Sequence, residues 1–116
     1  MSTRLPASLK KAGHAALDKK GEDVAALDLR KTAQFTDWFL LVSAQNQRQI
    51  VAIVDAVRDT LRVEGLRPVH VEGYPRQEWV LLDYGNFVVH VFTQRMRTFY
   101  DLERLWGGAT RVEIKG

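Results

Sequence analysis

The chain has 116 residues, of which 46% are hydrophobic and 27% charged, which suits one domain with a hydrophobic core and is too short for two. It contains no cysteine, which excludes disulfides, thiolate metal ligands and a cysteine nucleophile. No run of about 18 uncharged apolar residues occurs and the N-terminus lacks the apolar core of a signal peptide. We therefore expect a cytoplasmic protein that neither spans a membrane nor is exported by that route.

The net charge of +3 is unevenly distributed along the chain. Residues 1–20 carry five basic side chains and one acidic side chain, a net of +4, whereas the other 96 residues, with 12 basic and 13 acidic groups, sum to −1. A nucleic-acid footprint spread over the fold is therefore not predicted, and any phosphate contact should involve the first helix. The simpler interpretation, which we favour, is that these lysines form the solvated side of that helix.

The N-terminal part of the chain predicts a helix followed by two strands. Apolar residues at helical spacing run from Leu5 to Leu17, and Gly21 ends this pattern. Residues 24–29 and 38–43 are rich in bulky apolar side chains, which favours two β-strands separated by a short polar connection.

A second helix is the most clearly marked element. Asn46 is followed three residues later by Gln49, the spacing of a capping box. An apolar stripe then extends from Ile50 to Leu61, and Gly65 ends the pattern.

The C-terminal part predicts three strands and a last helix. Residues 68–72 form a short strand, residues 78–92 a hairpin of two strands, and residues 96–106 a helix ended by two glycines. Residues 107–116 are expected to be a C-terminal tail outside a core of about 9–106.

The order α-β-β-α-β-β-β-α predicts an α/β (α+β) fold: a single domain over 1–116 with a mixed five-stranded sheet and flanking helices. The strand 37–43, helix 46–64 and strand 68–72 should form a right-handed crossover with parallel strands, whereas the final hairpin must be antiparallel.

The hairpin predicts two different sheet faces. An even-membered loop would pair odd-numbered residues of its first strand with even-numbered residues of its second. One face would then be almost purely apolar and form core, and the other would combine Trp79, Asp83 and His90, which is unusual for a dry interior. We expect this mixed face to meet helices in part and a partner in part. The apolar face comprises Val80, Leu82, Tyr84, Phe87, Val89 and Val91, and the mixed face comprises Trp79, Leu81, Asp83, Val88, His90 and Phe92.

Several short motifs follow one another in a specific order: KGEDV (20–24), TDWFLLV (36–42), VEG (71–73), WVLLDYG (79–85), VHVF (89–92) and LERLW (102–106). Each is weak alone, but the ordered set resembles the ribosomal silencing factor family, RsfS or Iojap, over nearly the whole chain. The family fold resembles nucleotidyltransferases, yet the Gly-Ser pair and Asp-x-Asp motif that hold two metals in such enzymes are missing. Ser43-Ala-Gln-Asn46 also replaces a Gly-x-Ser turn that is common in the family.

The resemblance implies a regulator rather than an enzyme. It would bind the large ribosomal subunit through the ribosomal protein numbered fourteen, block joining of the small subunit sterically, and repress translation when nutrients are scarce. No cofactor, metal or direct nucleic-acid readout is expected, and a homodimer stays possible.

The second half of the chain is the predicted partner-binding site. Trp79 has a side chain typical of interface hot spots, and a core position at the strand start is its alternative role. Asp83 either supports the turn or contacts the partner, and His90 is interpreted as a structural or rim histidine. Arg97 and Glu103, six residues apart on one predicted helix, are not expected to pair. The predicted partner-binding residues are Glu72, Gly73, Trp79, Asp83, Tyr84, Gly85, His90, Arg97, Tyr100 and Glu103.

Two other classes stay open. A metal-dependent enzyme of nucleotidyltransferase or nuclease type would need clustered carboxylates, and Asp28, Asp37 and Asp83 lie at or near strand ends. A homodimeric interaction module without a ribosomal role would use an exposed aromatic patch for self-association.

Overall fold

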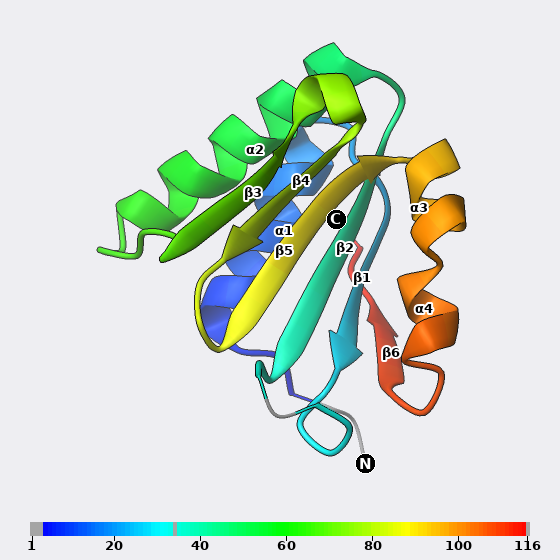
Figure 1. The fold of residues 1–116 in the computed structure, drawn as a ribbon. Helices are drawn as coiled ribbons and strands as arrows, with labels where there is room; N and C mark the ends of the chain where they lie inside the picture. Colours follow the sequence, from blue (N-terminus) through cyan, green and yellow to red (C-terminus); the bar gives the residue numbers. More distant parts are fainter. Residues whose placement is uncertain (1–3, 34, 116) are drawn as a thin grey trace.

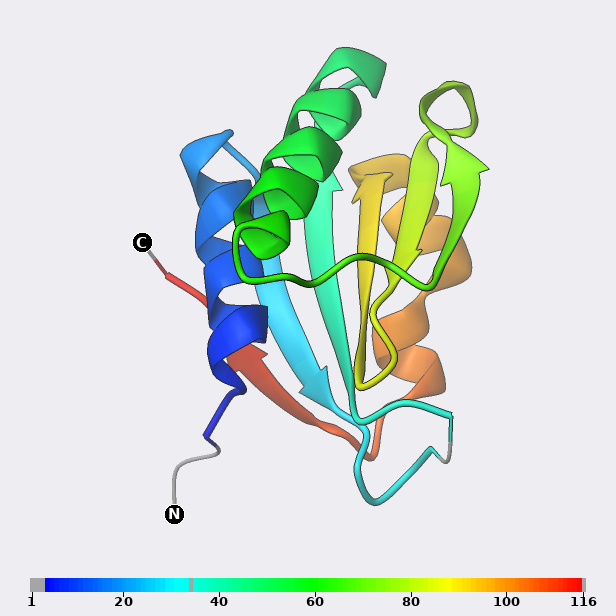
Figure 2. The ribbon, with the colours of Figure 1, turned by 90° about the vertical axis from the view of Figure 1, so that its left-hand side faces the viewer.

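The computed structural model describes residues 4–33 and 35–115, which form a six-stranded sheet between two layers of helices (Figures 1 and 2). The strand order is β3-β4-β5-β2-β1-β6, in which β2 and β5 are parallel and the other neighbours antiparallel. Within these residues no helix is both long and apolar enough to cross a bilayer. The elements are α1 (Ala7–Asp18), β1 (Glu22–Asp28), β2 (Trp38–Ala44), α2 (Gln47–Arg62), β3 (His70–Tyr74), the 3-10 turn η1 (Pro75–Gln77), β4 (Trp79–Asp83), β5 (Phe87–Thr93), α3 (Gln94–Tyr100), α4 (Leu102–Leu105) and β6 (Thr110–Glu113).

The start of α2 is capped as its sequence predicts, with one difference. The Asn46 side chain accepts a hydrogen bond from the backbone N–H of Gln49 at 2.9 Å. The Gln49 amide does not return to Asn46; it accepts from the Gln45 N–H at 2.6 Å and donates to the carbonyls of Lys19 and Lys20 at 3.1 and 2.8 Å. The second half of the predicted capping box therefore joins the start of α2 to the end of α1.

The main core lies between the sheet and the α1/α2 layer. The predicted stripe of α2 is buried, and the apolar face of the hairpin packs in the same cluster. In the hairpin, Trp79 pairs with Phe92 and Leu81 with His90, which confirms the predicted even-membered loop and the two faces. The buried α2 residues are Ile50, Ile53, Val54, Val57 and Leu61.

The single helix predicted over 96–106 is instead two short helices. The Thr93 hydroxyl caps α3 by accepting from the Met96 N–H at 3.3 Å. Asp101 adopts a left-handed conformation, φ 49° and ψ 50°, and its N–H bonds to the Arg97 carbonyl, which ends α3. Phe99, in the short helix α3, is 67% exposed.

The predicted C-terminal tail contains a sixth strand. β6 pairs antiparallel with β1, so the expectation of five strands is wrong. Beyond β6, the Ile114 N–H donates to the Val24 carbonyl at 2.9 Å, and its side chain is buried against Gly13 of α1. The alternation of Val112 and Ile114 with charged neighbours is a period-two strand signal, but it is short and follows two glycines.

The strands on either side of α2 are parallel, as predicted, but they are not neighbours. β5 lies next to β2, and β4 separates β5 from β3 at the sheet edge. The burial of each strand explains this order: every residue of β5 is buried, whereas β3 is mostly exposed. A largely apolar strand is stabilised at the sheet centre, and a more polar strand tolerates the edge.

Candidate functional site

One part of the sheet is left uncovered on the side where α3 and α4 lie. α3 contacts β5 and β2, and the open face of β3 and β4 is turned toward the viewer in Figure 1. At the boundary, the ring of Trp79 is 5.9 Å from that of Tyr100, which stacks on Phe99 at 5.4 Å. Tyr74 pairs with Trp79 across the two strands. Tyr74, Phe99 and Tyr100 are 60%, 67% and 48% exposed, and together with Trp79 they form what we call the aromatic surface.

Gly73 makes room for the indole of this surface. Its φ is +79°, a conformation that side-chain-bearing residues rarely adopt. A Cβ added here would lie 2.4 Å from the Trp79 carbonyl oxygen and 2.5 Å from Trp79 Cε3. Gly73 is thus placed beside Trp79, as part of its packing.

The buried side chain of His90 fixes the indole of Trp79 by a hydrogen bond. Trp79 Nε1 donates to His90 Nδ1 at 3.3 Å, and the Phe39 ring meets the imidazole edge-on at 4.6 Å between centroids. Burial lowers the pKa of His90 to about 3, so the ring is neutral near pH 7. Because Nδ1 accepts, the single proton belongs on Nε2, which is buried and has no hydrogen-bond partner among the described residues. The geometry indicates a structural histidine that fixes Trp79.

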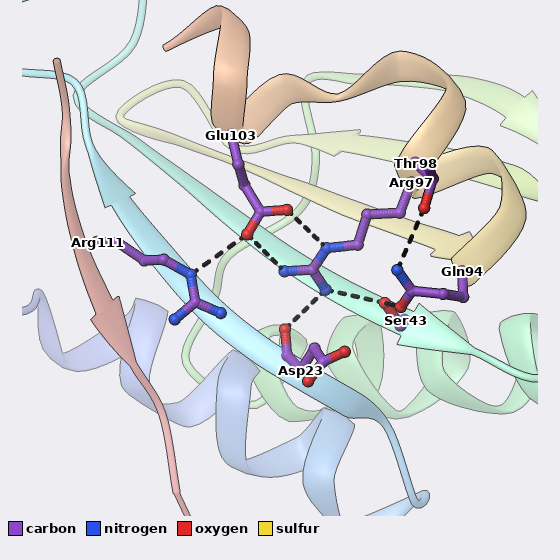
Figure 3. Close-up of polar contacts among 7 residues, drawn as sticks. All are labelled: Asp23, Ser43, Gln94, Arg97, Thr98, Glu103 and Arg111. Carbon is purple, nitrogen blue, oxygen red and sulfur yellow. Dashed lines mark hydrogen bonds and ion pairs between the residues drawn. The ribbon is translucent and has the colours of Figure 1, made fainter. Parts of the chain in front are cut away.

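Arg97 and Glu103 pair, contrary to the sequence prediction (Figure 3). The guanidinium donates to both carboxylate oxygens of Glu103, at 3.0 and 3.1 Å, and to Ser43 Oγ and the Asp23 carbonyl at 2.9 and 2.7 Å. The i,i+4 argument failed because the helix is interrupted at the left-handed Asp101, so Arg97 and Glu103 do not lie on one continuous helix. The Arg97 hydrogen bonds lower the pKa of the Glu103 carboxyl. Arg97 is only 4% exposed, so its role is to join α3, α4, β1 and β2.

The residues of the hairpin turn are not part of the aromatic surface. Asp83 accepts a hydrogen bond from the Gly85 N–H at 2.8 Å, the turn-supporting alternative of its two considered roles. Tyr84 lies on the other side of the sheet, stacked on Phe87 at 5.2 Å and packed against the main core. Burial raises the pKa of its hydroxyl. The ten predicted residues therefore do not form one continuous surface.

Two residues of the aromatic surface, Tyr74 and Phe99, were missed by sequence reasoning. The register of β3 against β4 brings Tyr74 beside Trp79, and Phe99 lies exposed on α3. Glu72, which was predicted, is exposed on the same edge strand and contacts His70 at 2.8 Å.

Two of the three carboxylates considered for metal binding, Asp28 and Asp83, have other partners. Asp28 forms a bidentate pair with Arg30, which lowers the pKa of Asp28, and Asp83 caps the turn. The described residues contain no group of three or more His, Cys, Asp or Glu side chains able to hold a metal ion.

Solved structures with this architecture include a crystal structure of a protein from Chromobacterium violaceum. It superposes with a TM-score of 0.84 at 33% sequence identity, covering 98% of this chain and 95% of the other. The class defined by the fold is thus an α+β domain with a mixed six-stranded sheet.

Sequence comparisons then define the family. The family model described as "Ribosomal silencing factor during starvation" (RsfS) matches residues 2–116. The ribosomal silencing factors of Halalkalibacterium halodurans and Bacillus subtilis are 38% and 37% identical, covering 93% and 91% of this chain and 92% and 90% of the relatives. A more distant mouse relative, 25% identical over 76% of this chain and 40% of its own length, is named mitochondrial assembly of ribosomal large subunit protein 1. The chain belongs to the RsfS family of ribosomal silencing factors.

Proposed function

We propose that this protein binds the large ribosomal subunit through the ribosomal protein numbered fourteen and sterically prevents the small subunit from joining, which represses translation under nutrient limitation. Family membership supports the ribosomal role. The observation that carries the docking site is the aromatic surface beside the uncovered strands β3 and β4.

Half-exposed aromatic side chains supply much of the binding energy in protein interfaces, because they bury large areas at low entropic cost. Trp79 is held by Gly73 and His90 before any partner arrives, so little side-chain freedom is lost on docking. His90 and Arg97 are buried and act in this proposal by positioning the surface rather than by touching the partner.

The residues outside the α1/α2 layer have a small acidic surplus, which would complement a basic partner. Outside the α1/α2 layer, residues 22–44 and 69–116 carry eight basic and ten acidic side chains, a net of −2. Glu72 is exposed on β3, and Asp83 lies partly exposed at the far end of β4. Electrostatic complementarity of this kind raises association rates and specificity more than affinity.

The proposed mechanism requires no chemistry. The folded chain measures 37 × 33 × 27 Å, so a protein of this size seated on the joining face would exclude the small subunit by volume alone. Binding and blocking are therefore expected to be lost together.

Co-sedimentation with purified large subunits tests the proposal with Tyr100→Glu. A charge placed in a desolvated interface centre should weaken binding at least about tenfold, and subunit joining measured on sucrose gradients should recover. Thr110→Glu is the matched control, because Thr110 is exposed on β6, at the opposite edge of the sheet from β3.

A second binding experiment uses isolated ribosomal protein fourteen in place of the large subunit. The same loss on Tyr100→Glu is expected there. Wild-type affinity of a folded Tyr100→Glu protein for the subunit would refute the aromatic surface, and binding to the subunit without binding to protein fourteen would refute the partner.

A further inference from the structure

The helices α1 and α2 lie on the opposite side of the sheet from α3 and α4 (Figure 2). Positive charge gathers in this α1/α2 layer. Residues 4–21 and 45–68, which contain both helices and their flanks, carry nine basic and four acidic side chains, a net of +5. From the sequence alone, the surplus of positive charge is assigned to the first helix and its flanks. Folding adds the arginines of α2 and its C-terminal loop to the same layer.

Two basic clusters lie at opposite ends of α2. At its start, a groove of about 560 Å³ runs between the helices and is lined by Lys19, Lys20 and Arg48. At its end, a hollow of about 180 Å³ is lined by Arg58, Arg62 and Arg67. No carboxylate lines either depression in the described chain.

Five of these six cations form no ion pair with any described residue. The exception is Arg62, which contacts Asp59 at 2.7 Å on the exposed side of the helix. All six side chains are exposed. Fully solvated cations without internal partners release counterions from a polyanion at little desolvation cost.

We propose that the α1/α2 face binds the phosphate backbone of structured RNA, without reading base sequence. The clusters are separated by the length of α2, 16 residues or roughly 24 Å, so two distant phosphate groups of one RNA helix can be contacted together. A membrane surface fits less well, since the apolar stripe of α2 is buried in the core and cannot insert into lipid. The contact lies outside the proposed protein-docking site, so one molecule can bind RNA and protein at once.

Fluorescence anisotropy with a labelled mixed-sequence RNA duplex of about 20 base pairs tests this face. The magnitude of the slope of log affinity against log salt should approach one unit per engaged cation between about 50 and 200 mM salt. Lys19→Gln, Lys20→Gln and Arg48→Gln combined should reduce that magnitude by about two to three units and weaken binding at the lowest salt at least about tenfold.

The matched control combines Lys31→Gln, Arg95→Gln and Arg104→Gln, which removes the same charge from exposed positions outside the α1/α2 layer. It should keep the wild-type slope within about one unit. The proposal would be overturned if the control variant lost as much duplex affinity as the Lys19, Lys20 and Arg48 variant. It would also be overturned if the wild type did not bind the duplex at low salt, or bound phosphatidylserine vesicles equally tightly. Tyr100→Glu should bind the duplex normally, so failure of the docking proposal remains distinguishable from failure of this one.

Discussion

At the residue scale, the site depends on one buried contact. His90 accepts from the Trp79 indole, and Gly73 leaves the space in which that indole lies. The imidazole has no aqueous surroundings to stabilise its charged form, and its Nε2 has no described acceptor. Protonation of His90 therefore opposes the folded state that orients Trp79.

This contact predicts a pH dependence of stability. The pKa of His90 is about 3 in the folded chain and about 6.5 when unfolded, so below pH 6.5 the unfolded chain binds the extra proton. The contribution is fully present above that pH, and the free energy of unfolding should fall by up to about 1.4 kcal/mol per unit as the pH drops toward 3. Urea unfolding between pH 7.5 and 5 measures this slope, and His90→Phe should flatten it. The exposed His14→Gln variant should retain the wild-type slope, and an unchanged slope in His90→Phe would contradict the assignment.

At the scale of elements, β6 is fastened to α1 as well as to β1. Gly13 is buried in the middle of α1, where glycine weakens a helix by about 1 kcal/mol relative to alanine. Glycine is favoured at this position because a Cβ at residue 13 would lie only 2.8 Å from Cδ1 of Ile114. The last strand thus determines which residue α1 can carry.

A double-mutant cycle tests this fit. Ile114→Ala should lower the free energy of unfolding by about 2 to 4 kcal/mol through cavity formation. Gly13→Ala alone should gain little, because the added methyl collides with Ile114. In the double variant the methyl enters the vacated space, so we expect a favourable coupling of about 0.5 to 3 kcal/mol in chemical denaturation. Strict additivity would show that the two side chains do not meet, and Gly13→Ala with the distant Val63→Ala provides the additive reference.

At the scale of the whole molecule, two unlike faces lie on opposite sides of one sheet. One side carries the aromatic surface, and the α1/α2 face is basic with exposed cations. Contacts between exposed charges are screened at physiological salt, where the Debye length is about 8 Å, whereas buried aromatic contacts are not. The two faces should therefore respond differently to salt.

Large-subunit binding measured at two salt concentrations tests this separation. Tyr100→Glu should weaken binding at both about 50 mM and about 150 mM salt, because its effect is desolvation within the interface. The Lys19, Lys20 and Arg48 to Gln variant should weaken it mainly at the lower salt. In the combined variant the losses should add. A strongly non-additive loss would indicate that both changes act on one contact or on the fold.

The sequence by itself determined the local features and part of the site. Helical and alternating periodicity placed α1, α2 and the hairpin, and it assigned the two hairpin faces, because side-chain direction repeats every few residues along the backbone. It also singled out Trp79, Gly73 and Tyr100, which the structure brings together.

Only the tertiary structure decided which of these local features meet. The strand order depends on competition for the buried centre of the sheet, and Arg97 reaches Glu103 because the helix is interrupted at Asp101. Likewise, the basic cluster at the start of α2 forms because the end of α1 packs against it, although the two segments are far apart in the chain. Periodicity reports the direction of a side chain within its own element. The partner across the fold is set by long-range packing, which minimises buried polar groups and apolar exposure over the whole chain at once.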